Sequence, residues 1–212
     1  MKKLKIAYFK AVTFGVSLYR RQKRKRRKGI IVTDMTNQTA NANNRNKTYE
    51  LVICAIFIAL TYVATWLINI RLPFMGSGGL IHLGNVPLFV AAMLYGRKTG
   101  AVAGASGMGL FDLFSGWTSW APFTFVIVGA MGYVVGLMAE KKPFANVTIN
   151  NIVSVLLAIV IKIVGYYFAE VILYGNWVAP FGSIPGNIIQ VGVAGIIVLA
   201  FIQQLRKYVK AL

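Results

Sequence analysis

The chain has 212 residues, of which 57% are apolar and 13% are charged. Soluble domains carry roughly 25% charged and roughly 45–50% apolar residues. The composition therefore argues against an ordinary soluble enzyme and favours a protein with several membrane-spanning helices. A single cysteine, Cys54, excludes a disulfide-rich secreted fold.

The formal net charge of +18 is concentrated at the front of the chain. Residues 1–47 hold 14 Lys and Arg and one acid, whereas residues 48–212 hold nine and four. We expect 1–47 to be a basic, disordered extension, and Met35 is an alternative start for the chain. The run RRQKRKRRK at 20–28 is typical of a cytoplasmic tail, an anionic-lipid arm or a nucleic-acid arm. We expect no nucleic-acid partner, because the apolar body is only mildly basic.

Six apolar segments follow this extension, and each is predicted to form a membrane-spanning helix. They cover about residues 49–70, 84–96, 99–115, 119–139, 147–174 and 184–205. The sequence therefore predicts an all-α polytopic membrane domain with six transmembrane helices over residues 48–212.

Basic residues fall on one side of this predicted layout. The connections at 97–98 and 141–142 and the C-terminal tail hold seven of them, and the opposite connections hold only Arg71. The asymmetry places both termini in the cytoplasm. The alternative is a re-entrant hairpin of the second and third segments, which would bury Arg97 and Lys98 at a cost of several kcal/mol. Two separate spans are therefore preferred.

Polar and aromatic side chains gather near the outer ends of the predicted helices. They are His82, Asn85, Asp112, Trp117, Trp120, Tyr166, Glu170, Asn187 and Gln190. An interfacial aromatic belt with amides joining helices would explain some of them, but it explains the two carboxylates poorly. The pattern favours an outward-facing pocket for a small, flat, polar molecule. Lys162 lies about 12 Å below Glu170 along its helix and is ranked below it as a ligand contact.

The two longer outer connections are candidate covers for this pocket. The Gly-rich segment 71–83 suits a mobile lid, with a plain connector as the alternative. No phosphate-binding loop, HExxH motif or Cys/His cluster occurs in the sequence. We therefore expect no metal, no cofactor and no catalytic residue. A stand-alone carrier, or a membrane enzyme using Asp112 or Glu170 as acid and base, are the competing hypotheses.

Several motifs in the membrane body point to a family. They are IHLGN at 81–85, YGRKTGAVAG at 95–104, GLFDLFSG at 109–116 and WAPFTFVIVGAMGYVVG at 120–136. With Ala55 and Ala59 four residues apart on the first helix, the pattern resembles the substrate-binding S components of energy-coupling factor (ECF) transporters. The resemblance covers about residues 49–210 and does not extend to the basic front extension.

The resemblance implies a subunit of the bacterial plasma membrane that captures a vitamin or vitamin precursor. It would act with a transmembrane scaffold (T) subunit and two ATPase (A) subunits, so the chain itself would not be an enzyme. Ala55 and Ala59 would face the scaffold. The pattern is most similar to members for hydroxymethylpyrimidine or pyridoxine, with riboflavin and pantothenate as alternatives. Pantothenate has no ring to stack on aromatic side chains.

Overall fold

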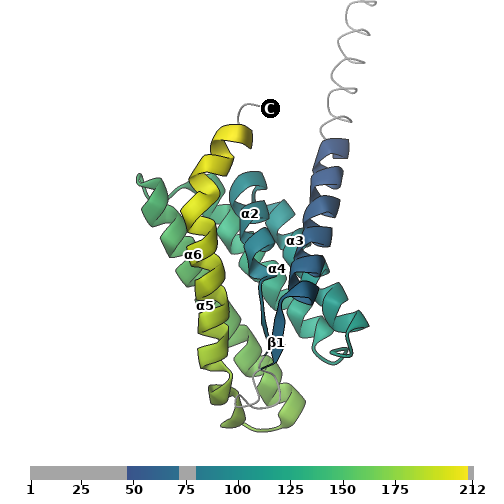
Figure 1. Ribbon diagram of the computed structural model, residues 1–212. Coiled ribbons are helices and arrows are strands. Elements are labelled where there is room, and N and C mark those ends of the chain that lie inside the picture. Colours follow the sequence, from purple (N-terminus) through teal and green to yellow (C-terminus); the bar gives the residue numbers. More distant parts are fainter. Residues whose placement is uncertain (1–46, 72–79, 210–212) are drawn as a thin grey trace, which may run out of the picture. The chain divides into compact units, whose positions relative to one another are not determined.

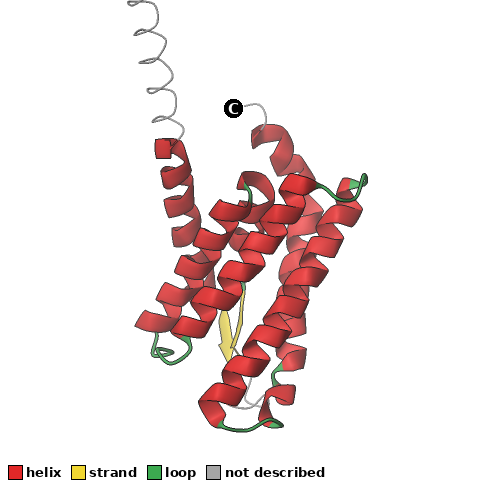
Figure 2. Ribbon diagram, turned by 180° about the vertical axis from the view of Figure 1, so that it is seen from behind, coloured by secondary structure: helices red, strands yellow, loops and turns green. Residues whose placement is uncertain are grey.

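A computed structural model describes residues 47–71 and 80–209 of the chain (Figure 1). Helices dominate these residues (Figure 2). In chain order, the elements are a first helix Lys47–Leu67, β1 (Asn69–Arg71), β2 (Leu80–His82), α2 (Asn85–Tyr95), α3 (Arg97–Phe114), α4 (Ala121–Lys141), α5 (Val147–Tyr174), the 3-10 helix η2 (Ala179–Gly182) and α6 (Ile184–Val209).

Four helices among the described residues are long and apolar enough to cross a membrane: the first helix, α4, α5, and α6 together with η2. By contrast, α2 has 11 residues, or about 17 Å of helix, against roughly 30 Å of bilayer hydrocarbon. The α3 helix has 18 residues, and its sequence includes Arg97, Lys98, Asp112 and several glycines. All six predicted segments are thus helical. The number of spans and the side of the membrane that holds the termini stay predictions.

The short α2 lies among the other helices and forms the centre of the core. It packs against α3, α4 and α6. Leu88, Phe89 and Ala92 of α2 are fully buried, together with Val128 of α4 and Val191 of α6. An apolar helix of this length is stable in this place because its neighbours cover it on several sides.

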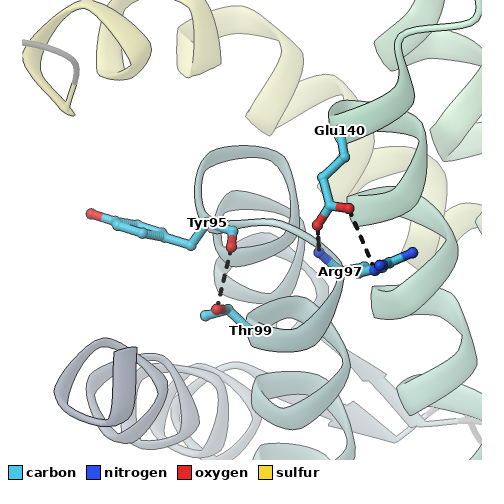
Figure 3. A network of polar contacts seen from close by, with 4 residues as sticks. All are labelled: Tyr95, Arg97, Thr99 and Glu140. Atoms are coloured by element: carbon cyan, nitrogen blue, oxygen red, sulfur yellow. Dashed lines mark hydrogen bonds and ion pairs between the residues drawn. The ribbon is translucent and has the colours of Figure 1, made fainter. Parts of the chain in front are cut away.

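A single residue, Gly96, links α2 to α3. Its φ of 90° lies in the left-handed region, and a side chain there would collide with the Glu140 carboxylate. That carboxylate accepts a 2.8 Å hydrogen bond from the Arg97 amide and lies 3.4 Å from Arg97 Nε (Figure 3). Thr99 Oγ1 donates to the Tyr95 carbonyl at 3.4 Å. The contacts with Glu140 join the link to the end of α4.

The α3 and α4 helices approach each other closely through glycines. A Cβ atom on Gly132 would collide with the Gly100 carbonyl, so the two backbones are in direct contact there. Small residues at four-residue spacing permit this packing in membrane helices.

The hairpin of β1 and β2 was not expected from the sequence. The strands are antiparallel, and Asn69 pairs with His82. The predicted lid at 71–83 lies largely in residues 72–79, outside the described residues. The hairpin brings His82 to the start of α2. The turns 115–120 and 175–183 lie at the same end of the helices (Figure 1, bottom). We call this the pocket end, and the end that carries Gly96 and Lys142 the basic end.

Candidate functional site

A cavity opens at the pocket end between β2, the α3–α4 turn and the helices α3 to α6. Its volume is about 50 Å³. Its lining residues are His82, Asp112, Trp117, Trp120, Thr124, Lys162, Tyr166, Glu170, Asn187 and Gln190. Residues far apart in the sequence therefore surround one space.

Eight of the nine residues expected at a binding site line this cavity, and their role as ligand contacts stays a prediction. Asn85 does not line it. Its side chain is fully buried at the start of α2, with no hydrogen-bond partner among the described residues. Lys162 and Thr124, which were not among the expected contacts, are part of the lining.

The α3–α4 turn positions the two tryptophans. Gly116 adopts a φ of 85°, which an L side chain would disfavour. The Trp117 amide then donates to the Asp112 carbonyl at 3.0 Å, and the Trp120 amide donates to the Trp117 carbonyl at 2.8 Å. This tight turn places Trp117 and Trp120 beside the end of α3 that carries Asp112.

Aromatic rings form one wall of the cavity. The rings of Trp120 and Tyr166 have centroids 6.0 Å apart and are tilted by 38°, and Tyr174 packs edge-on against Trp120 at 6.0 Å. The Tyr166 and Thr124 hydroxyls share a 3.0 Å hydrogen bond. These contacts restrain Trp120 and Tyr166, so that the wall is formed before any ligand enters.

A buried polar chain forms the deep part of the cavity. Lys162, 2% exposed, donates from its ammonium to Gln190 Oε1 and lies 5.4 Å from the centroid of the Tyr166 ring. Gln190 Nε2 in turn donates to the His82 carbonyl at 3.3 Å. Both ends of the Gln190 amide are therefore used within the protein, and Gln190 positions Lys162 and β2 relative to each other.

His82 is held as a neutral imidazole. Its Nδ1 accepts a 3.3 Å hydrogen bond from the Gly84 amide, which leaves the proton on Nε2. Burial, reinforced by the nearby charge of Lys162, lowers the pKa of His82 well below its usual value. At neutral pH, His82 therefore offers the site one N–H donor and no charge.

The charged groups of the lining are two carboxylates and one ammonium. Asp112 and Lys162 are close enough for their opposite charges to interact, and Glu170 is 5% exposed on the same helix as Lys162. No group of three His, Cys, Asp or Glu side chains among residues 47–71 and 80–209 is arranged to hold a metal ion. A flat wall beside donors and acceptors suits a small planar molecule with polar edges.

Comparison with known proteins decides the family. Residues 45–207 match the family model described as "ECF-type riboflavin transporter, S component". The chain belongs to this S-component family. Family membership and the long apolar helices make this S component a multi-pass bacterial membrane protein. S components of ECF transporters work with T and A subunits, and the homologues of this chain are transport subunits rather than enzymes.

Two proteins of similar sequence align with this chain over most of their lengths. The thiamine precursor transporter HmpT of Lactococcus lactis subsp. cremoris is 28% identical over 142 residues, which are 67% of this chain and 78% of the relative. An uncharacterized protein of Pyrococcus woesei is 32% identical over 133 residues, which are 61% of this chain and 83% of the relative. The sequence similarity thus extends over most of the S component.

Solved structures share the fold. An S component of a bacterial ECF transporter aligns with a TM-score of 0.60 and 20% identity, over 77% of this chain and 99% of that one. The S component for biotin from an ECF-type ABC transporter gives 0.60 and 17%, over 77% and 94% of the two chains. ThiT of Listeria monocytogenes gives 0.56 and 22%, over 77% and 98%.

Proposed function

We propose that this S component binds a small heteroaromatic vitamin or vitamin precursor in the cavity at the pocket end, for import by its partner subunits. The observation that carries the proposal is the convergence of eight expected residues, with Lys162 and Thr124, around one space. Hydroxymethylpyrimidine and pyridoxine are the favoured ligands. Each has one heteroaromatic ring with hydroxymethyl substituents, and HmpT, a relative, is a thiamine precursor transporter.

We assign a role in ligand binding to each part of the wall. Trp120 and Tyr166 would stack on the ring, since aromatic pairs favour offset or tilted packing. Asp112 and Glu170 would accept hydrogen bonds from amino or hydroxyl groups on the ring edge. Lys162 and the His82 N–H would donate to ring nitrogens or hydroxyl oxygens.

Riboflavin is the second candidate, because the matching family model names it. Its fused rings would also stack on the aromatic wall, but they need a longer slot than a single ring does. A direct competition between the ligands decides the question. Purified full-length protein would be titrated by calorimetry with hydroxymethylpyrimidine, pyridoxine, riboflavin and pantothenate, and we expect submicromolar binding of one single-ring ligand. Selective binding of riboflavin would overturn the preference, and the absence of binding by folded protein would overturn the proposal.

Replacement of Glu170 by Gln tests the pocket itself. A buried hydrogen bond to a charged group contributes about 1.5–3 kcal/mol, so we expect Glu170→Gln to weaken binding about tenfold to a hundredfold. Glu140→Gln is the matched control, because Glu140 pairs with Arg97 at the basic end. Asn187→Ala should also weaken binding. Unchanged affinity in both pocket variants would remove the proposed site.

We further propose that import requires one T scaffold and two ATPase subunits, with Ala55 and Ala59 on the docking face. Both alanines are exposed on the first helix, as are Leu51, Ile56 and Val63 of the same helix. Uptake by liposomes that contain this protein alone would instead support a stand-alone carrier.

A further inference from the structure

A second cavity lies at the basic end, opposite the pocket end. It is formed where α2, α4 and α6 end and α5 begins, and its volume is about 370 Å³. Lys142, Arg206 and Lys207 line it together with Gln203, Met93 and Val147. Nothing in the proposed capture of a vitamin uses this cavity.

The charge of this cavity has one sign. No carboxylate belongs to its lining within the described residues. The nearby Glu140, two residues before Lys142, is paired with Arg97. The lining therefore concentrates three cations at the mouth of a hollow, which favours an anionic occupant.

Only one of the three basic side chains, Arg206, is hydrogen-bonded to neighbouring residues in the described part of the chain. Arg206 donates to the Met93 carbonyl at 3.4 Å and to Asn151 Oδ1 at 3.3 Å, so it ties the end of α6 to α2 and α5. The ammonium groups of Lys142 and Lys207 have no hydrogen-bond or ion-pair partner within residues 47–71 and 80–209. Lys142 also follows α4 directly, with a left-handed φ of 46° that caps the helix.

The apolar walls of the cavity and its position at the helix ends indicate which kind of anion could bind there. Met93, Leu94, Ala139 and Val147 contribute apolar surface beside the basic groups. The cavity lies where the long apolar helices α4, α5 and α6 end or begin. Phospholipid headgroups lie at this level of a bilayer, directly above the acyl chains.

We propose that this cavity is a binding site for the phosphate headgroup of an anionic phospholipid. Lys142, Lys207 and the outer N–H groups of Arg206 bind the phosphate oxygens, and the apolar walls contact the upper part of an acyl chain. The proposal depends on the chain being a membrane protein and is independent of which vitamin the pocket binds.

The test compares two double variants that lose the same charge. Full-length protein in a zwitterionic detergent is titrated with short-chain phosphatidylglycerol, and bound lipid is measured by native mass spectrometry. Lys142→Gln with Lys207→Gln removes two cavity cations. Lys98→Gln with Lys141→Gln is the matched control, since both residues are exposed near the same end outside the cavity lining. We expect about a tenfold or greater loss of affinity in the first double variant and less than about a twofold change in the control.

Three results would overturn the proposal. Equal weakening in both double variants would mean that only general surface charge attracts the lipid. Equal affinity for short-chain phosphatidylcholine would remove the selectivity for an anionic headgroup. Competition by glycerol phosphate at the affinity of the intact lipid, lost in the same variant, would assign the site to a free phosphate compound. Circular dichroism and thermal melting of both variants establish that they are folded.

Discussion

At the scale of single residues, burial fixes the hydrogen-bond partners and the protonation of several polar groups in the pocket. Gln190 uses both ends of its amide to hold Lys162 and the His82 carbonyl. Removal of the Gln190 side chain would therefore leave a buried ammonium without its acceptor. Gln190 thus holds two parts of the cavity lining together through contacts within the protein.

The protonation of His82 gives a prediction at this scale. A histidine in the unfolded chain takes up a proton below about pH 6.5, whereas the folded His82 stays neutral because its pKa is lowered. The contribution of neutral His82 to the free energy of unfolding is therefore fully present above pH 6.5. It is lost as the pH falls toward the pKa of the folded state, by at most about 1.4 kcal/mol per pH unit.

Thermal melting between pH 5 and pH 8 tests this effect, with His82→Asn as the comparison. Asparagine keeps an acceptor for the Gly84 amide but does not titrate, and His82 is the only histidine of the chain. We expect the melting temperature of the wild type to fall more steeply below pH 6.5 than that of the variant. Parallel curves would show that His82 is protonated equally in both states.

Eight of the nine residues singled out in the sequence line one cavity, because helix ends at one level of a bundle meet each other in space. Their contact with a ligand stays a prediction. Lys162 was ranked below Glu170 on its depth along α5, but the cavity extends down that helix and includes both. Asn85 was expected in the lining because it lies at the outer start of the second predicted helix. The helical start of α2 turns its side chain into the protein instead. Side-chain direction at a helix start is set by packing and is not visible in spacing alone.

At the scale of elements, close contact between α3 and α4 depends on glycines without side chains. Gly132→Ala would place a methyl group against the Gly100 carbonyl, whereas a methyl group on Gly192 of α6 meets nothing within 4 Å. We expect Gly132→Ala to lower the free energy of unfolding by about 1–3 kcal/mol. Gly192→Ala, the matched control, should raise it by up to about 1 kcal/mol through helix propensity.

Thermal melting of the two variants in detergent measures this difference. Similar melting temperatures for Gly132→Ala and the wild type would contradict the close contact.

The spacing of these glycines was visible in the sequence, but the hairpin of β1 and β2 was not. Its strands have three residues each, too few for an alternating pattern of apolar and polar residues to stand out.

At the scale of the whole molecule, one side of the first helix is buried and the other is exposed on the surface. Its residues Phe57, Thr61 and Thr65 are buried, whereas Ala55 and Ala59 are exposed. Small exposed residues let a second helix approach closely. This is the surface on which we expect the T subunit to dock.

Bulky substitutions on this surface test the docking. Ala55→Trp or Ala59→Trp should leave vitamin binding intact and abolish co-purification with T and A subunits. Ala200→Trp on α6 is the matched control, because Ala200 is also an exposed alanine within a long helix. Recovery of the complete complex with either first-helix variant would refute this docking face.

The central position of α2 also bears on how the chain enters a membrane during synthesis. A helix of eleven residues is short for stable insertion as an independent span. Gly96 joins α2 to α3 without a loop, so the two helices would have to leave the translocon as one antiparallel hairpin. A nascent chain that ends at Gly96 would offer α2 only the first helix, through Phe57 against Ala91 and Tyr95, without α3, α4 and α6. We therefore expect insertion of this part of the protein to be completed only after α3 has been synthesised.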